Sequence, residues 1–191
     1  MVKPEIAALP GNRERMLEAA IDLLRGFGLS GAGINDVVRE SGAPKGSVYH
    51  FFPGGKLQIA GEALAVYIGR VEAFIDAALA GRRSNAERVR ALFEAFARRV
   101  EDAGCRRSCA IGTVSLDLGD EADEVRPLLR EALDTWARVI AHHVDLGDAW
   151  RTRSLAGFVL TAIEGAYVRA RAEGSGQAFR EAGGWLSQLV A

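Results

Sequence analysis

The sequence predicts an all-α protein of about nine helices, and three observations support this fold class. Apolar residues recur every three or four positions along most of the chain, and strand-like alternation is almost absent. Ala, Leu, Arg and Glu, all good helix formers, dominate the sequence. With 191 residues, 49% of them hydrophobic, the chain can bury a full core in one or two domains.

The N-terminal part is predicted to begin with a loose arm over residues 1–11 and to continue in a helix. Asn12 can cap this helix, and its apolar positions follow a 3.6-residue period as far as Phe27. Gly28 then ends it. We expect this helix to supply the hydrophobic floor of a three-helix unit.

Residues 34–56, INDVVRESGAPKGSVYHFFPGGK, predict two short helices, the turn between them and the start of a third helix. Gly42 can take the left-handed conformation that ends a helix, and Pro44 has the fixed φ that suits the start of the next. The connection has the length and chemistry of a helix-turn-helix. The second short helix opens with N–H groups, a lysine and a hydroxyl, which suit contacts to phosphates and base edges in a major groove.

The stretch SGAPKGSVYHFFPGGK resembles the DNA-binding signature of the TetR family of transcriptional regulators, and its form is most similar to the LmrA/YxaF-like branch. The resemblance implies an N-terminal helix-turn-helix DNA-binding domain over residues 1–54 and a ligand-binding and dimerisation domain over residues 55–191. It implies a double-stranded DNA operator as partner, contacted by Asn35, Lys45, Gly46, Ser47, Tyr49, His50 and Lys56.

The second domain is predicted to start within a long helix from Gly55 to about Leu79, which spans roughly 37 Å and can act as a lever between the domains. Ser84 and Glu87 form a capping box that opens the next helix. Residues 105–119 predict a short, glycine-interrupted apolar helix. By resemblance to the branch, the cysteine and the acidic residue of this segment are Cys109 and Asp117.

Three further helices complete the predicted fold. Asp123 can cap a long helix that tolerates Pro127 in its first turn and runs to about Leu146. An Ala- and Gly-rich helix over residues 152–173 and a shorter final helix over residues 179–190 follow.

The Ala- and Gly-rich helix has a broad apolar face, which is either ordinary core or the surface of a partner subunit. TetR-like proteins dimerise through their last two helices, so the resemblance favours a homodimer. Two recognition helices about 34 Å apart would then read a two-fold-symmetric operator. The predicted interface residues are Leu155, Phe158, Val159, Ala162, Ile163, Ala166, Phe179, Leu186 and Leu189.

Between the long helix and the last helices, the sequence offers apolar walls with a few polar points, which suit a hydrophobic or aromatic small molecule. The resemblance implies an inducer site here, whose ligand would tilt the long helix and release the DNA. A repressor is the commoner case in the family. The predicted ligand contacts are Phe93, Phe96, Cys109, Trp136, His143 and Tyr167.

Charge gives little support for nucleic acid, because the net charge is −1 and residues 1–56 hold seven Lys and Arg against six Asp and Glu. Any positive footprint must be local, from Lys45, Lys56, Arg39 and Arg13. No run of 18 apolar residues and no leader segment is found, so we expect a cytoplasmic protein without a membrane partner.

Other functional classes remain open. Cys105 and Cys109 lie beside arginines, so a lowered thiol pKa and redox sensing are one alternative, and a helical protein-interaction adaptor is another. An enzyme is not expected, because no phosphate loop, nucleophile motif or zinc spacing is found. His142 and His143 are adjacent and point to different faces, so we predict no metal site and no cofactor.

Overall fold

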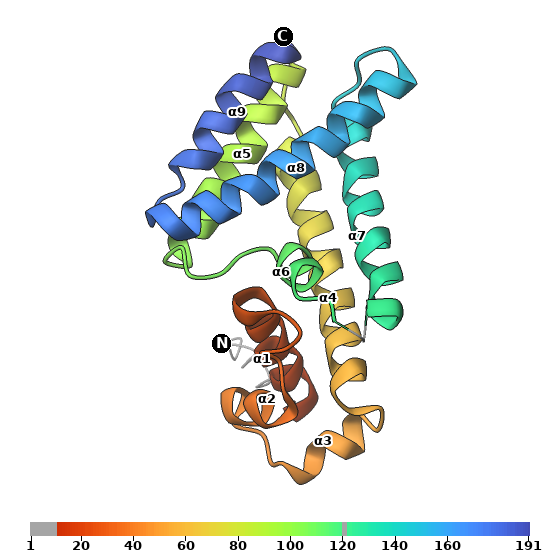
Figure 1. Cartoon of the computed structure of the whole chain (residues 1–191). Helices are drawn as coiled ribbons and strands as arrows, with labels where there is room; N and C mark the ends of the chain where they lie inside the picture. The colour runs from red at the N-terminus through yellow and green to blue at the C-terminus, as the bar shows by residue number, and fades with distance from the viewer. Residues whose placement is uncertain (1–10, 120–121) are drawn as a thin grey trace, which may run out of the picture.

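The computed structural model describes residues 11–119 and 122–191, and within these ranges it contains nine α-helices and no strand (Figure 1). The predicted all-α class is confirmed. Most of the predicted N-terminal arm lies outside the described residues. The lower part of the molecule in Figure 1 consists of α1 (Asn12–Phe27), α2 (Ile34–Ser41), α3 (Gly46–Phe51) and the first turns of α4 (Gly55–Leu79).

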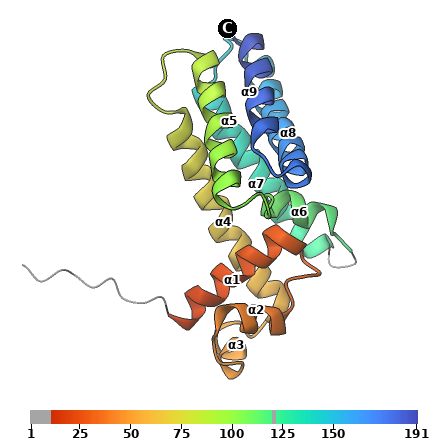
Figure 2. The same cartoon turned by 90° about the vertical axis from the view of Figure 1, so that its left-hand side faces the viewer.

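The helix α4 connects the two parts, running from the base of the molecule into the middle of the upper bundle (Figures 1 and 2). In the bundle, α5 packs on α9 and α4 packs on α7, while α8 crosses both pairs. The short helix α6 lies between the end of α1 and the bundle. The remaining helices are α5 (Asn85–Asp102), α6 (Ala110–Leu116), α7 (Ala122–His143), α8 (Ala149–Glu173) and α9 (Gln177–Leu189).

The glycine that separates the two short helices behaves as predicted. Gly42 is the C-cap of α2 with a φ of 62°, and its N–H donates to the carbonyl of Val38 at 3.1 Å. The helix after the turn starts two residues later than Pro44, because Lys45 is its N-cap. Residues 43–45 therefore form the turn that sets the angle between α2 and α3.

Two predicted helix starts differ from the structure. The N-cap of α1 is Gly11, without a side-chain cap, because Asn12 is already helical and its side chain accepts a hydrogen bond from Arg15. The helix α7 begins at Ala122, which places Pro127 beyond the first turn, inside the helix. Asp123 is therefore not the N-cap of α7, and its side chain lies outside the described residues.

The capping box of α5 is confirmed. The hydroxyl of Ser84 accepts a hydrogen bond from the N–H of Glu87 at 3.2 Å. The side chain of Glu87 reaches back one residue further than expected and accepts from the N–H of Arg83 at 2.9 Å. Both bonds satisfy N–H groups that a helix start would otherwise leave unpaired.

Charged groups fix the start of α9 against α5. Glu101 accepts from the N–H of Gly176 at 2.9 Å and from the guanidinium of Arg180 at 2.8 Å, while Arg180 also pairs with Glu94 at 2.9 Å. The hydrogen bonds from Arg180 and Gly176 lower the pKa of Glu101 to about 2. These bonds set the register between the two helices.

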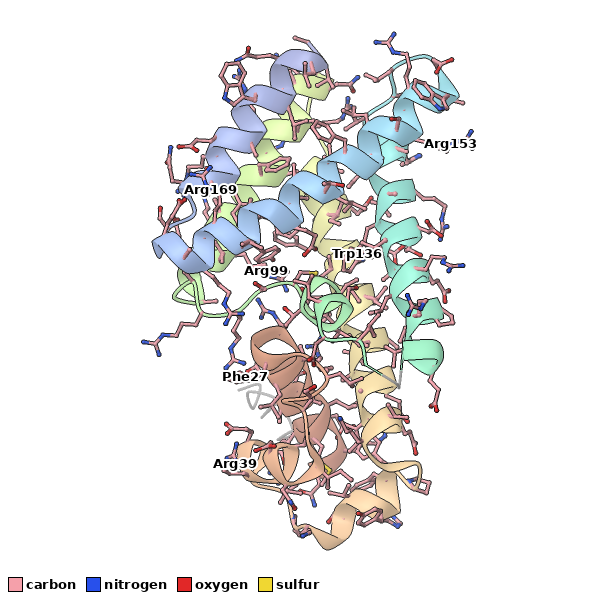
Figure 3. All side chains as sticks on the ribbon, in the orientation of Figure 1. Phe27, Arg39, Arg99, Trp136, Arg153 and Arg169 are labelled. Carbon is pink, nitrogen blue, oxygen red and sulfur yellow. The ribbon has the colours of Figure 1, made fainter. Side chains whose placement is uncertain are left out.

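The core is continuous from the lower part into the bundle. Met16, Leu24, Val48 and Phe52 are fully buried around α1 and α3, as predicted. Phe27 is the exception, because its side chain is 67% exposed at the end of α1 and points away from the core (Figure 3). No helix within the described ranges is long and apolar enough to cross a lipid bilayer.

Candidate nucleic-acid interface and ligand cavity

The helix α3 presents a polar surface at the base of the molecule. Lys45, Gly46, Tyr49 and His50 are exposed, and Ser47 is half-buried. The helix is held from above by apolar residues, because Val48 and Phe52 are completely buried and Phe51 is half-buried. All five predicted contacts therefore lie on one accessible surface.

Gly46 is not required by the fold itself. It lies in the first turn of α3, and a Cβ atom added to it would meet no heavy atom within 4 Å. Gly42 differs, because its left-handed φ of 62° strains any other residue. A glycine with open space at an exposed helix start suits the close approach of a ligand to the backbone.

The two other predicted contacts flank this surface. Asn35 is exposed in the first turn of α2. Lys56 lies in the first turn of α4 and lines a hollow together with Ser30 and Asp117. The predicted residues are thus brought to the base of the molecule by three helices, α2, α3 and α4.

The two arginines expected to add positive charge are already paired. Arg39 forms ion pairs with Asp36 at 2.7 Å and with Glu40 at 3.2 Å. Arg13 pairs with Glu62, and its guanidinium carbon lies 5.5 Å from the ring centroid of Phe52. The charges of Arg39 and Arg13 are therefore largely balanced by neighbouring carboxylates.

A small, nearly closed cavity of about 10 Å³ lies inside the upper bundle. Four of the six predicted ligand contacts line it, namely Phe96, Cys109, Trp136 and Tyr167. Sequence reasoning missed the other lining residues, which are Tyr67, Val71, Ile75, Leu160, Ile163 and Glu164.

The two remaining predicted contacts lie elsewhere. Phe93 is buried between α5 and α9, where it packs against Gly183. His143 is at the end of α7 and its Nε2 lies 2.7 Å from Oδ1 of Asp76 on α4. Both follow the apolar period of their helices, but they lie at other points along the helix than the cavity does.

A chain of polar groups runs along the cavity wall, with Tyr67 and Cys109 buried and Glu164 half-buried. The Tyr67 hydroxyl hydrogen-bonds to the Cys109 thiol, and that thiol hydrogen-bonds to the carboxyl of Glu164. Burial raises the pKa of the Cys109 thiol, and the neighbouring Glu164 raises it further. Burial also raises the pKa of Glu164, although the bond from Cys109 opposes this shift.

The lowered thiol pKa that the redox-sensing alternative requires is found at neither cysteine. Burial is the first cause that raises the pKa of Cys105, and the charge of Glu101 adds to it. Both cysteines are free and buried. A thiol of this kind carries little thiolate at neutral pH, which argues against redox sensing.

Glu164 and Tyr67 could have been found in the sequence. Glu164 follows Leu160 by four residues and precedes Tyr167 by three, so it lies on the apolar side of α8. Tyr67 follows Leu64 by three residues and precedes Val71 by four, so it lies on the apolar side of α4. A polar residue within an apolar helical stripe was the available signal.

The short helix α6 connects the cavity to the DNA-binding unit. Its N-cap, Cys109, lines the cavity, and a Cβ atom at Gly112 would overlap the carboxyl of Glu164. Its C-cap, Asp117, accepts hydrogen bonds from the N–H and the hydroxyl of Ser30 at 2.6 and 3.0 Å. Two turns of helix thus separate the cavity wall from the loop that follows α1.

Further bonds hold the end of α1 from above. The N–H of Ser108 donates a hydrogen bond to the carbonyl of Arg25 at 3.1 Å. In return, the guanidinium of Arg25 donates to the carbonyl of Ser108 at 3.0 Å. Arg107 donates to the carbonyl of Asp22 at 2.7 Å, and Arg171 of α8 donates to that of Gly26 at 3.3 Å. The end of α1 is therefore attached to both α6 and α8.

The predicted interface residues divide into two groups. Val159, Ile163, Ala166, Phe179 and Leu186 are buried in the core of the chain itself, because α8 and α9 turn their most apolar sides inward. Phe158 and Leu189 are 53% and 68% exposed, and Leu155 and Ala162 are half-buried.

An exposed apolar face remains on α8 and α9, which lie side by side (Figures 1 and 2). Trp185 and Val168 are 73% and 62% exposed on it, next to Phe158 and Leu189. A groove between the two helices is lined largely by small residues and is bordered by Arg169, Glu181 and Trp185. We call this surface the α8/α9 face, comprising Phe158, Ala162, Gly165, Val168, Ala182, Trp185 and Leu189.

An all-helical fold with an exposed recognition helix and an attached cavity-containing bundle defines a helix-turn-helix DNA-binding protein. Residues 16–63 match the family of bacterial regulatory proteins, tetR family, and residues 85–184 match the transcriptional regulator LmrA/YxaF-like C-terminal domain. The chain belongs to the TetR family, and its C-terminal domain is of the LmrA/YxaF-like type. The predicted resemblance is confirmed, and the chain is a DNA-binding transcriptional regulator rather than an enzyme.

Several named proteins are similar over most of the chain. An uncharacterized HTH-type transcriptional regulator of Mycobacterium tuberculosis is 35% identical, over 85% of this chain and 86% of that protein. The HTH-type transcriptional regulator LmrA of Bacillus subtilis is 31% identical, over 67% of this chain and 68% of that protein.

Solved structures confirm the fold. The regulatory protein TetR from Rhodobacter sphaeroides superposes with a TM-score of 0.85 at 23% identity and covers 94% of this chain and 99% of that chain. A cysteine mutant of the TetR family regulator CifR, solved with double-strand operator DNA, gives 0.80 at 22% identity, over 96% and 98% of the two chains.

The structure offers no metal centre in the parts that it describes. No group of three or more His, Cys, Asp or Glu side chains there is arranged to hold a metal ion. The rings of His142 and His143 lie 5.2 Å apart at the end of α7, and the nearest acid to His143 is Asp76.

Proposed function

We propose that the protein is a repressor that binds a two-fold-symmetric operator as a homodimer and is released by a small, largely hydrophobic effector. The observation that carries this proposal is the position of α6. One helix of seven residues has its N-cap at the cavity and its C-cap bonded to the DNA-binding unit. A ligand that displaces Cys109 must therefore also act on Ser30.

The DNA-binding half of the proposal rests on the surface of α3. Lys45 supplies a phosphate contact, Gly46 allows the backbone to approach the DNA closely, and Tyr49 and His50 reach phosphates or base edges. Asn35 and Lys56 add phosphate contacts at the starts of α2 and α4. Arg13 and Arg39 are paired with carboxylates and add little net charge. The affinity for DNA therefore comes from the shape of this surface and from a few direct contacts.

Dimerisation is assigned to the α8/α9 face. Four large apolar side chains on it are more than half exposed, and small residues between them allow another helix to approach closely. The operators that such a dimer reads would have half-sites about one helical turn, or 34 Å, apart. This assignment replaces the five core residues of the predicted interface by their exposed neighbours.

The proposed ligand response depends on the size of the cavity, because an effector does not fit into it unless the helices around it move. The cavity holds only about 10 Å³ in this structure, far less than most ligand pockets, which hold roughly 300 to 1,000 Å³. An effector would enlarge it by moving α6 and α4 relative to α8. A coupling of about 1–3 kcal/mol between the two sites would weaken DNA binding roughly 5- to 150-fold.

The test is operator binding by Gly46→Ala, measured by fluorescence anisotropy with DNA from the region flanking the gene. The added methyl group meets no protein atom, so the folded state should be as stable as the wild type or more stable. It would occupy the space of the DNA backbone, and we expect the affinity to fall about tenfold.

The matched control is Gly69→Ala, which also places a methyl group in open space on an exposed helix, but on α4 far above α3. It should bind the operator like the wild type. Lys45→Ala should weaken binding to operator and unrelated DNA alike and reduce the salt slope by about one. Equal affinity of Gly46→Ala and wild type would contradict the proposed approach of α3 to DNA.

A further inference from the structure

Two arginines of the upper bundle hold the C-terminal end of α1. Arg107, in the loop before α6, donates to the carbonyl of Asp22 at 2.7 Å, and it also pairs with the carboxylate of Asp22 at 3.2 Å. Arg171 of α8 donates to the carbonyl of Gly26 at 3.3 Å. The last carbonyls of a helix have no partner inside the helix, and positive charge is favoured beside them. We call Arg107 and Arg171 the arginine clamp.

The position of Arg171 on α8 gives the clamp its direction. Arg171 follows the buried Tyr167 by four residues, so it continues the inner side of α8 beyond the cavity. Phe158 and Ala162 of the α8/α9 face lie on the opposite side of the same helix. One helix therefore carries the proposed dimer surface on one side and a bond to the end of α1 on the other.

The DNA-binding unit follows α1 when α1 moves. Arg70 of α4 donates to the carboxylate of Glu18 at 2.8 Å, and Arg13 of α1 pairs with Glu62 of α4. Apolar packing joins α3 to the same unit, because Val48 and Phe52 are completely buried. The orientation of α1 relative to α8 therefore determines where α3 lies relative to the dimer surface.

We infer that the arginine clamp fixes the spacing of operator half-sites that the dimer accepts. Both arginines are positioning residues, because they act on α3 through α1. This inference rests on the proposed function, since half-site spacing matters only for a dimer on a two-fold-symmetric operator. Arg171 reaches α1 directly from α8, so its contribution is separate from the bond between Asp117 of α6 and Ser30.

Loss of the clamp leaves other attachments of α1 in place. The N–H of Ser108 donates to the carbonyl of Arg25 at 3.1 Å, and Asp117 still accepts from Ser30. Arg171 is exposed, so its replacement removes no part of the core. Clamp variants should therefore fold and bind DNA, but with a DNA-binding unit that is less firmly oriented against α8.

The test compares operators that differ only in the distance between their half-sites. The operator is taken from the DNA flanking the gene, and one base pair is inserted at its centre of symmetry. The insertion moves one half-site by about 3.4 Å and rotates it by about 34° around the DNA axis. Affinities for both duplexes are measured by fluorescence anisotropy, and we expect the wild type to bind the original at least about thirtyfold more tightly.

Arg171→Met keeps an unbranched side chain and removes the donor, so we expect the ratio of the two affinities to fall about threefold. The double variant Arg107→Met/Arg171→Met should lower the ratio about tenfold. Arg171→Lys keeps the charge and a donor, and it should recover part of the ratio. The matched control is Arg153→Met, which removes the same charge from an exposed position at the other end of α8 (Figure 3).

A ratio of affinities cancels the general loss of attraction to DNA that follows removal of a positive charge. Arg171→Met and the double variant would overturn the inference if both kept the wild-type ratio, even with weaker binding to both duplexes. Equal binding of the two duplexes by the wild type would instead contradict the two-fold reading of DNA in the proposed function, and the inference would fail with it.

Discussion

Glu164 is a half-buried acid in the wall of the cavity, and its position is expected to lower the stability of the folded chain. Burial is the cause that raises its pKa above the ordinary value of 4.5, and the bond from Cys109 opposes the shift. The other groups at the cavity are the hydroxyls of Tyr67 and Tyr167, with Arg25 acting on both tyrosines. An acid held in an apolar wall is expected to lower the free energy of unfolding.

The sign of this cost predicts a pH dependence. Below pH 4.5, Glu164 is protonated in both the folded and the unfolded chain and contributes nothing. As the pH rises, the unfolded chain ionises first, so the stability of the wild type falls until the raised folded pKa is passed. Glu164→Gln should therefore be more stable than the wild type at neutral pH, with the difference shrinking toward pH 4.5.

Urea unfolding of both proteins at several pH values measures this difference, and the exposed variant Glu124→Gln serves as the control. It should unfold like the wild type at neutral pH. A Glu164→Gln protein that is less stable than the wild type at neutral pH would show that the ionised carboxyl has a favourable partner in the folded chain.

Sequence patterns predicted the exposed residues of α3 better than the residues that line the cavity. The motif around Lys45 is local, because its residues are neighbours along the chain and one turn places them together. The cavity is assembled from α4, α5, α6, α7 and α8, so its lining depends on the relative rotation of helices that are distant in sequence. Phe93 and His143 fit the apolar period, and only packing distinguishes them from Phe96 and Trp136.

At the scale of helices, α9 approaches α5 closely at Gly183. A Cβ atom at Gly183 would lie 2.5 Å from Cβ of Phe93, whereas one at Gly184 would meet nothing within 4 Å. Gly183→Ala should lower stability by about 1–3 kcal/mol because Phe93 is fully buried and cannot move aside. Gly184→Ala should raise it by up to about 1 kcal/mol.

Thermal or urea unfolding of the two alanine variants provides the comparison, since both add the same methyl group to the same helix. Similar stability of the two variants would show that α9 can shift on α5. The sequence contained both glycines, but only the structure shows which of them faces the neighbouring helix.

The helix α6 is the element expected to transmit the ligand signal. Asp117→Asn replaces the carboxylate that accepts two hydrogen bonds from Ser30 by an amide with a single acceptor oxygen. We expect the variant to keep its cavity intact and to lose most of the effect that an effector of the wild type has on operator affinity. Ser115→Ala, an exposed change on the same helix, is the control and should keep the wild-type response.

Operator affinity measured with and without the ligand gives the coupling for each protein, and an undiminished ratio in Asp117→Asn would exclude this contact from the signal. Resemblance to the branch pointed to Cys109 and Asp117, and the structure shows their roles as the two caps of α6. The bond to Ser30 could not be predicted, because it joins residues 87 positions apart.

For the whole molecule, the proposed function requires two chains that present two copies of α3. The predicted interface chose the most apolar positions of α8 and α9, and those positions are the ones that a single chain buries first. The face left for a partner is less apolar on average and is marked by isolated large side chains such as Trp185 and Phe158. Periodicity alone does not separate these two sides of a helix.

Trp185→Glu tests the α8/α9 face directly. The side chain is 73% exposed, so the folded chain should tolerate the change, whereas a charge buried in a dimer without a partner is strongly unfavourable. We expect light scattering to give twice 20.5 kDa for the wild type and 20.5 kDa for the variant. Leu116→Glu, at an 87% exposed residue of α6 outside this face, should remain dimeric.

The monomeric variant also separates the cavity, which one chain forms alone, from operator binding, which is proposed to need two chains. Its cavity lies within one chain, so the cavity should be unchanged, whereas operator affinity should fall by at least about a hundredfold because each α3 then binds a half-site alone. A Trp185→Glu protein that remains a dimer would place the partner on another surface. A wild type that is monomeric while it binds its operator tightly would contradict the two-fold reading of DNA altogether.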